Sequence, residues 1–291
     1  MPQRLPPTLL ERLLPGPLRR LDAELADRLE KAPLQLNDFG FDPYGFHPAS
    51  ARNLLLPSAL LYRYWFRVET HDIARVPEGG ALLIANHSGQ FGYDGAMLAL
   101  AMLLDAAPPR LARGMAEHLF ARTPWAGTSL ARMGSLIGTP ENCVAMLEAG
   151  ECVMVFPEGA RGANKPFRKR YQLQSFGTGF LRLALQTGTP IVPVGIVGAE
   201  EQQPGFANLE SFGRRFNLPS FPITISQPWF GLLGSAFALP VKYHFYFGEP
   251  LHFEGDAWDR DAAIEEKIES VKDAIRALLA RGLAERAGIF R

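Results

Sequence analysis

A histidine and an aspartate lie close together in the segment NHSGQFGYD, in which six residues separate His87 from Asp94. A carboxylate bonded to one imidazole nitrogen fixes the tautomer of the ring and makes the other nitrogen a better base. The pair therefore indicates general-base chemistry, with Asp94 orienting His87. From the spacing alone a second interpretation is favoured, in which Asp94 caps the following helix and His87 is a solvated loop residue.

A second group of polar residues follows the apolar run ECVMVF, in the segment FPEGARGANKPFRKR. Glu158 and Gly159 lie in a predicted turn, Arg161 follows two residues later, and Lys165 and Arg168 belong to a dense basic run. A glycine turn lets backbone amides approach an anion, and arginine can hold a phosphate through two hydrogen bonds. The segment predicts an anion site, with a solvated basic face as the alternative.

Other residue types that perform chemistry occur without a supporting pattern. Ser88 adjoins His87, but NHSGQ is not the G-x-S-x-G nucleophile elbow, and no G-x-G-x-x-G or Walker sequence is present. Cys143 and Cys152 are too few for a disulfide framework or a cysteine-built zinc site. The remaining histidines are scattered, without pairing at metal-ligand spacing: His47, His71, His118, His244 and His252. We therefore expect no metal and no cofactor.

The elements that must position these residues alternate between strand and helix from about residue 68. The apolar runs in ALLIANHS, ECVMVFPEG and TPIVPVGIVGA are typical of buried strands. Helices are expected in GAMLALAMLL, in GTGFLRLALQTG and over 139–149, where Thr139 is a good N-cap and Pro140 a good first helical residue. This order predicts an α/β fold with a mixed, mainly parallel sheet covered by helices. Ligands of such sheets bind beyond the carboxyl ends of the strands, where both polar segments lie.

Two further elements are expected near the end of the chain. The segment KYHFYFGEPLHF alternates with period two and predicts a late strand. Asp261–Glu285 predicts a long helix whose apolar residues share one face: Ile264, Ile268, Val271, Ile275 and Leu278.

Residues 1–67 predict a helical N-terminal arm that precedes an α/β domain over 68–291. Leucines recur at helical spacing between Leu9 and Leu21, interrupted by prolines, which suits either a membrane-surface helix or a helix packed on the core. Residues 51–67 resume a helical pattern with aromatics beside an arginine, which suits either a lipid headgroup interface or, as is more common, an aromatic helix end packed on the protein. The apolar loop 228–240 is a second candidate membrane contact, with a buried crossover as the alternative.

The composition is that of a folded globular protein, with 47% hydrophobic and 21% charged residues. Thirty basic residues balance thirty acidic ones, so no basic field indicates nucleic acid as a partner. The N-terminal residues lack the apolar region of a signal peptide, and prolines interrupt the longest uncharged stretch, 216–241. Any membrane contact is therefore expected to be peripheral.

Taken in order, NHSGQFGYD, FPEGARG and TPIVPVGIVGAE resemble the glycerolipid acyltransferase superfamily, which includes the 1-acylglycerol-3-phosphate acyltransferases. Members carry NH-x4-D, FPEGTRS and PIVPV after successive strands. The resemblance extends over residues 68–250, and the histidine–aspartate spacer here is two residues longer than usual.

The resemblance implies that His87 deprotonates an acceptor hydroxyl, that Asp94 orients it, and that the alkoxide attacks an acyl thioester directly. The donor would be acyl-CoA or acyl carrier protein, on the cytoplasmic face of a membrane. A lysophospholipid-type acceptor would lie against residues of both motifs: Ser88, Glu158, Gly159, Arg161, Lys165 and Arg168. An apolar tunnel would end at His87.

The stretch GSLIGTPEN lacks the arginine that members place there to bind an acceptor phosphate. The segment YQLQSFGTGFLRLAL also resembles the branch that acylates neutral acceptors such as diacylglycerol. An acyltransferase for a neutral lipid alcohol or a lyso-aminolipid is therefore an alternative. A thioester hydrolase and a non-catalytic lipid-binding protein are alternatives of a different class.

Overall fold

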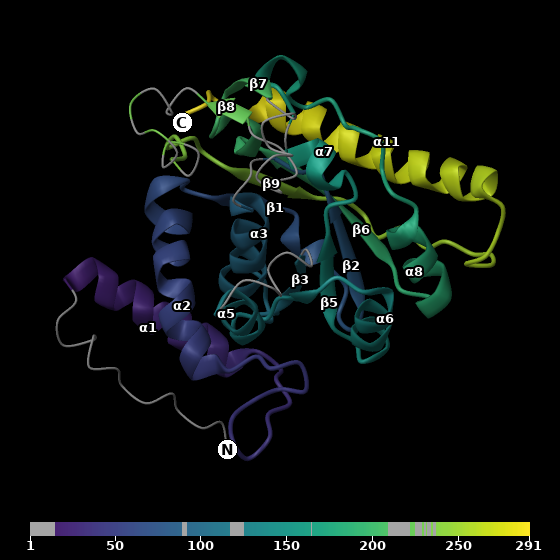
Figure 1. Ribbon diagram of the computed structural model, residues 1–291. Helices are drawn as coiled ribbons and strands as arrows, with labels where there is room; N and C mark the ends of the chain where they lie inside the picture. Colours follow the sequence, from purple (N-terminus) through teal and green to yellow (C-terminus); the bar gives the residue numbers. More distant parts are fainter. Residues whose placement is uncertain are drawn as a thin grey trace.

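A seven-stranded sheet forms the centre of the protein, with helices on both faces (Figure 1). The computed structural model describes residues 15–88, 92–116, 125–163, 165–208, 222–224, 229, 231, 234 and 237–291. The strands lie in the order β1 (Glu69–His71), β9 (His244–Phe247), β6 (Ile191–Val197), β2 (Ala81–Ala85), β5 (Cys152–Val155), β3 (Ala112–Ala116) and β4 (Leu136–Ile137).

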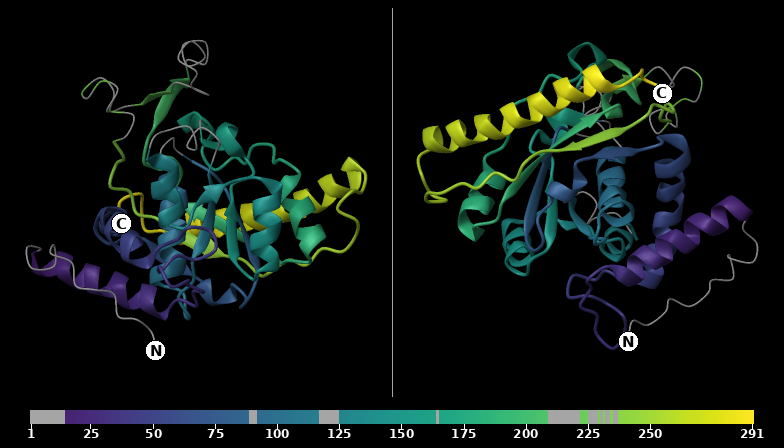
Figure 2. Two further views of the ribbon diagram at one scale, coloured as in Figure 1. Left: turned by 60° about the horizontal axis from the view of Figure 1, so that its bottom comes forward. Right: turned by 180° about the vertical axis from the view of Figure 1, so that it is seen from behind.

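Neighbouring strands of this sheet run parallel, except that β6 and β9 are antiparallel. The predicted α/β fold with a mixed, mainly parallel sheet is therefore confirmed. A separate antiparallel ribbon of β7 (Gly205–Asn208) and β8 (Pro222–Thr224) extends from the main body (Figure 2).

Helices form two layers around the sheet. On one side lie α1 (Gly16–Lys31), α2 (Pro48–Leu60) and α3 (Tyr93–Leu104), and on the other lie α6 (Pro140–Glu148), α8 (Gly179–Thr187) and α11 (Asp261–Glu285). Two shorter helices, α5 (Ala126–Arg132) and α7 (Gly159–Ala163), follow β3 and β5 along the chain. No helix in the described part of the chain is both long and apolar enough to span a membrane.

The strand β2 shows why its sequence is a continuous apolar run. Ala81, Leu83 and Ala85 belong to the core beneath α1, α2 and α3, whereas Leu82 and Ile84 belong to the core beneath α6, α8 and α11. A strand that is covered on both faces has no solvent side, so the alternation of a half-buried strand is missing.

Several local predictions agree with the fold. The hydroxyl of Thr139 accepts a hydrogen bond from the amide of Asn142 and caps α6, with Pro140 in its first turn. The predicted apolar face of α11 is buried. The late strand is present as β9, but all four of its residues are buried, because both faces of the strand are covered: Phe245 and Phe247 belong to one core and Tyr246 to the other.

The described part of the N-terminal arm packs on the core. Leu21, Leu25 and Leu29 of α1 are buried, and α1 contacts both α2 and α3. A buried ion pair connects the two N-terminal helices, with Arg52 Nε 2.8 Å from Asp22 Oδ1. The core-packed interpretation thus holds for Gly16–Lys31. Leu9 and the other residues before 15 lie outside the described residues, and a membrane-surface role for them stays a prediction.

Candidate active site

Three adjacent parallel strands, β6, β2 and β5, end at the same edge of the sheet. His87 follows the end of β2, Glu158 follows β5, and Glu200 follows β6. Because carboxyl ends of parallel strands meet at one edge, residues more than 100 positions apart come within hydrogen-bonding distance there. The candidate site is built at this edge.

His87 and Asp94 form a hydrogen-bonded pair despite the six-residue spacer. Asp94 lies in the first turn of α3, and its Oδ2 is 2.7 Å from Nδ1 of His87. The buried carboxylate also accepts hydrogen bonds from the amides of Ser88 and Gly95, at 2.8 Å each. These bonds hold Asp94 in place, so that Nδ1 of His87 is engaged and Nε2 is the nitrogen available to a substrate.

The surroundings of His87 make it a stronger base than a free imidazole. Burial by itself lowers the pKa of His87, but the charge and the hydrogen bond of Asp94 outweigh it, and the pKa is raised above its ordinary value. The ring packs on Phe156 with 4.7 Å between ring centroids. Its side chain remains 18% exposed, so the imidazole is accessible from the edge of the sheet.

The carboxylate of Glu158 points into the protein. Its oxygens accept hydrogen bonds from the main-chain amides of His87, at 3.0 Å, and Gln174, at 2.8 Å. Glu158 therefore joins the loop after β5 to the loop that carries the histidine.

Lys165 lies between two buried carboxylates. Its ammonium nitrogen is 3.2 Å from Glu158 Oε2 and 2.9 Å from Glu200 Oε1, and its side chain is only 4% exposed. Burial raises the pKa of Glu200, although the attraction of Lys165 opposes this effect. The three residues connect the ends of β5 and β6 through a buried ion-pair network.

Asn86 completes this network beneath the histidine. Its side-chain amide donates to Glu200 Oε1 at 3.1 Å and to the carbonyl of Ile196, while its carbonyl oxygen accepts from the amide of Ile196. Tyr171 donates its main-chain amide to the other oxygen of Glu200. Asn86 and Glu200 are not among the site residues predicted from the sequence, yet Glu200 follows a buried strand, the same signal that indicates His87 and Glu158.

The other predicted site residues occupy different environments. Ser88 is buried, and its hydroxyl has no hydrogen-bond partner among the described residues. Gly159 begins α7 with a left-handed backbone, φ +53°, and is exposed, as are Arg161 in α7 and Arg168 in the turn that follows. The structure thus buries the side chains of Ser88, Glu158 and Lys165 near the His87–Asp94 pair. Arg161 and Arg168, close to Glu158 in sequence, lie on the surface.

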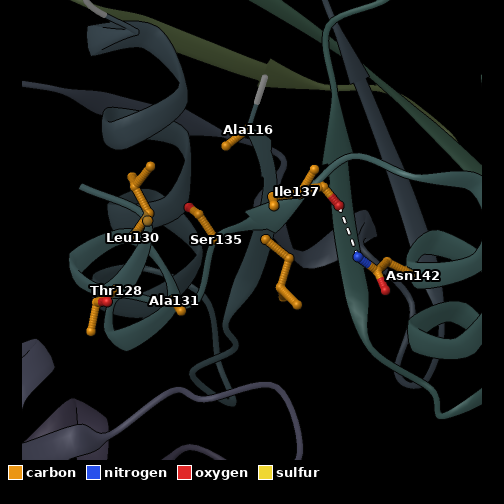
Figure 3. A pocket seen from close by; sticks show the side chains of 9 residues that line it. Ala116, Thr128, Leu130, Ala131, Ser135, Ile137 and Asn142 are labelled. Atoms are coloured by element: carbon orange, nitrogen blue, oxygen red, sulfur yellow. Dashed lines mark hydrogen bonds between the residues drawn. The ribbon is translucent and has the colours of Figure 1, made fainter. Parts of the chain in front are cut away.

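A pocket of about 360 Å³ opens beside β3, two positions from β2 in the sheet (Figure 3). Its lining is mainly apolar: Ala116, Gly127, Thr128, Leu130, Ala131, Ser135, Leu136, Ile137 and Asn142. Asn142 donates its side-chain amide to the carbonyl of Ile137 at 3.0 Å, the dashed line of Figure 3. His87 does not line this pocket, so the predicted apolar tunnel ending at His87 remains an expectation.

Comparisons with known proteins place this site within a family. A family model described as Acyltransferase matches residues 67–197, the range that holds β1 to β6 and the His87–Asp94 pair. An uncharacterized protein of Mycobacterium tuberculosis is 36% identical over 285 residues, which cover 95% of this chain and 78% of that protein. A Bos taurus protein named DGAT1/2-independent enzyme synthesizing storage lipids is 24% identical over 215 residues, covering 74% of this chain and 60% of that protein.

Among solved structures, the 1-acyl-sn-glycerophosphate acyltransferase PlsC of Thermotoga maritima has a similar fold. The TM-score is 0.50 at 18% sequence identity, and the match covers 79% of this chain and 80% of that chain. The family model contains both strand-end motifs of the site, and the mycobacterial relative matches along nearly the whole chain. The chain therefore belongs to the glycerolipid acyltransferase family.

Proposed function

We propose that the protein is an O-acyltransferase that moves a fatty acyl group from an acyl thioester to the hydroxyl of a lysophospholipid-type acceptor. The observation that carries the proposal is the 2.7 Å contact between His87 Nδ1 and Asp94 Oδ2 at the carboxyl edge of the sheet. A carboxylate on Nδ1 selects the tautomer whose Nε2 carries a lone pair, which is the form a general base requires.

The reaction needs one base and no covalent enzyme intermediate. His87 Nε2 takes the proton of the acceptor hydroxyl as the oxygen attacks the thioester carbonyl carbon. The tetrahedral intermediate then breaks its carbon–sulfur bond, and the proton passes from Nε2 to the departing thiolate. Asp94 stabilises the imidazolium that exists between these two steps. The thioester is that of coenzyme A or acyl carrier protein, and the chain supplies its own catalytic groups without a cofactor.

A phosphate-bearing acceptor is supported by the exposed basic side chains that follow β5. Arg161 and Arg168 lie on the segment that begins at Glu158, whose carboxylate contacts the histidine loop. Arginine binds phosphate oxygens through paired charge-assisted hydrogen bonds. We infer that these two arginines bind the acceptor headgroup. Lys165 instead forms the buried ion pairs with Glu158 and Glu200.

One observation favours a second acceptor class, a neutral lipid alcohol such as diacylglycerol. Residues 134–142 lack the arginine expected of enzymes that bind an acceptor phosphate there. Instead Leu136 and Ile137 of this stretch line the mainly apolar pocket beside β3. An apolar wall at that position suits an acyl chain or an uncharged glyceride better than a phosphate.

We infer that the protein contacts the cytoplasmic face of a membrane peripherally, through a cluster of exposed aromatic side chains. Tyr64, Trp65 and Phe237 are exposed, and Trp65 packs edge-on against Phe237. Arg67 donates hydrogen bonds to main-chain carbonyls on either side of this cluster, including that of Pro240 at 2.8 Å. Aromatic rings beside arginine are typical of side chains at the headgroup level of a bilayer.

A single assay distinguishes these functions. The purified protein is incubated with an acyl-CoA or an acyl carrier protein thioester, together with lysophosphatidic acid, diacylglycerol, a lyso-aminolipid or no acceptor. Mass spectrometry then measures the acylated lipids and the free fatty acid. Acylated lysophosphatidic acid supports the first proposal, and acylated diacylglycerol the second. Fatty acid released equally without an acceptor would show a thioester hydrolase.

The matched variant for this assay is His87→Ala. Loss of a general base lowers the rate by about 10²–10⁴-fold, while the fold is retained. Substantial acyl transfer by a folded His87→Ala protein would contradict the proposed role of His87. Lipid binding without turnover in the wild-type protein would indicate a non-catalytic lipid-binding protein.

A further inference from the structure

Three side chains that can bind a metal meet at the junction of β1 and β9. The two strands are parallel neighbours, and their register pairs Glu69 with His244 and His71 with Tyr246. Paired residues of neighbouring strands share a face of the sheet, as do residues two apart on one strand. Glu69, His71 and His244 therefore project from the same face, although 173 positions separate the two histidines in sequence.

Two of the distances between their donor atoms match the edges of a tetrahedral metal site. His71 Nε2 is 3.2 Å from His244 Nδ1, and His244 Nδ1 is 3.4 Å from Glu69 Oε2. All three ligand atoms lie within 4.8 Å of one another. Zinc bonds to nitrogen and oxygen of about 2.0–2.1 Å place two tetrahedral ligands about 3.3–3.4 Å apart.

We propose that Glu69, His71 and His244 form a binding site for a divalent first-row transition metal ion of the zinc type. Two imidazoles and one carboxylate are a donor set that suits Zn²⁺ and leaves a fourth position for water. Mg²⁺ prefers an octahedral shell of oxygens, so two nitrogen donors select against it.

The site is both accessible and held in shape. Glu69 is 50% exposed and His244 only 7%, so an ion enters from the solvent side and reaches a buried nitrogen. The ring of His71 stacks on Tyr246, with 4.2 Å between ring centroids and 6° between planes, which fixes its orientation. Lys242 binds the other oxygen of Glu69 at 2.5 Å and so orients the carboxylate, as outer partners of metal ligands do.

The positive charges around the cluster are each paired with a carboxylate. Lys242 pairs with Glu69, and Arg281 pairs with Asp72 and Glu285. Three further pairs lie close by: Arg75 with Asp72, Arg75 with Glu249, and Arg286 with Glu201. Apart from Glu69, the named cations Lys242, Arg75, Arg281 and Arg286 are matched in number by the carboxylates of Asp72, Glu201, Glu249 and Glu285, so Glu69 gives this group of residues a net negative charge.

Metal binding is measured on the full-length protein after treatment with a chelator. Zn²⁺ is titrated in competition with a chromophoric chelator, bound metal per chain is determined by elemental analysis, and thermal unfolding is followed with and without Zn²⁺. The variants are Glu69→Gln and His71→Gln. The controls are His252→Gln, at an exposed histidine, and His87→Ala, at the proposed catalytic base.

We expect one Zn²⁺ per chain in the wild-type protein and in both controls, with a higher Tm when Zn²⁺ is present, because a ligand that binds the folded state stabilises it. Glu69→Gln and His71→Gln should weaken binding by at least ~10-fold and lose the Tm increase, since even outer partners of metal ligands change affinity by that factor. Mg²⁺ should have no effect. Equal affinity in all five proteins, or binding lost only in His87→Ala, would overturn the proposal. Retained binding in His87→Ala keeps this test separate from that of the acyltransferase function.

Discussion

Glu158 accepts a hydrogen bond from the main-chain amide of His87 at 3.0 Å, so the second sequence motif of the site holds the first one in position. The same carboxylate is paired with Lys165 and is fully buried. Glu158 therefore fixes the position of the loop that carries His87 through this hydrogen bond. Changes at this contact should affect catalysis through the position of His87.

Asp94→Asn should lower kcat by about 10²–10⁴-fold without unfolding the protein, because an amide in place of the carboxylate no longer stabilises the imidazolium or selects the tautomer with a free Nε2. The substitution changes the 2.7 Å hydrogen bond between Asp94 Oδ2 and Nδ1 of His87. Acyl-transfer kinetics and circular dichroism measure the two properties. Turnover near the wild-type level would remove Asp94 from the mechanism.

The pH dependence of kcat/KM should report the raised pKa of His87. Only the neutral ring accepts a proton, so the rate should increase with pH and level off above an apparent pKa higher than the ordinary value of about 6.5. In Asp94→Asn the effect of burial, which lowers this pKa, remains without the opposing carboxylate. The acid limb of the residual activity should then move to lower pH, and an unchanged limb would refute the assignment.

The same pKa shift predicts a change in stability. Because the pKa of His87 is raised on folding, its protonated ring stabilises the fold below the ordinary pKa, and this contribution is lost as pH increases through the folded-state value. Relative to the wild type, His87→Ala should therefore be least stable at acidic pH and recover as pH rises. Urea unfolding at several pH values measures this difference, and a constant difference would contradict the linkage.

Lys165→Met should destabilise the protein by about 3–5 kcal/mol, because it leaves the buried carboxylates of Glu158 and Glu200 without their shared cation. The matched control is Arg168→Met in the same basic run, whose side chain is exposed and whose loss should change stability little. Urea unfolding compares the two variants. Equal effects would mean that the buried network contributes no more than an exposed charge.

Gly162→Ala should impair the site through close packing. A Cβ atom at residue 162 would lie 2.5 Å from the Cβ of Glu158 and 3.1 Å from that of His87, so the loops must move apart. Overpacking of this kind costs about 1–3 kcal/mol, and the movement should also lower kcat. Gly288→Ala is the control, because no atom lies within 4 Å of its added methyl group. Unfolding and kinetics of both variants check the prediction.

Membrane contact through the aromatic cluster should depend on Tyr64 and Phe237. The double variant Tyr64→Ser/Phe237→Ser should sediment less with anionic phospholipid vesicles than the wild type, because both exposed rings are lost. Trp258→Ser is the control, since Trp258 is also an exposed aromatic residue, more exposed than either Tyr64 or Phe237, but lies in the segment before α11. If the control lost as much binding as the double variant, the cluster would have no special role.

The sequence was sufficient to predict the sheet class and the edge where the site lies, because buried parallel strands are continuous apolar runs and polar residues follow them. It also predicted the His87–Asp94 contact through the family motif. Spacing could not show that Lys165 is buried and Arg168 exposed. Lys165 is buried because the fold brings Glu158 and Glu200 together around its ammonium group. Nor could spacing indicate the His71–His244 pair, which depends on the pairing of two strands distant in the chain.

The placement of β9 has a consequence for synthesis on the ribosome. In the sheet, β9 lies between β1 and β6, and among the described strands β1 has no other neighbour. The polypeptide that forms β1 therefore leaves the ribosome long before its pairing partner exists, since His71 precedes His244 by 173 positions. Until then one flank of β6 also exposes unpaired backbone groups, which are prone to association with other chains. Closure of this sheet must therefore wait until β9 has been synthesised.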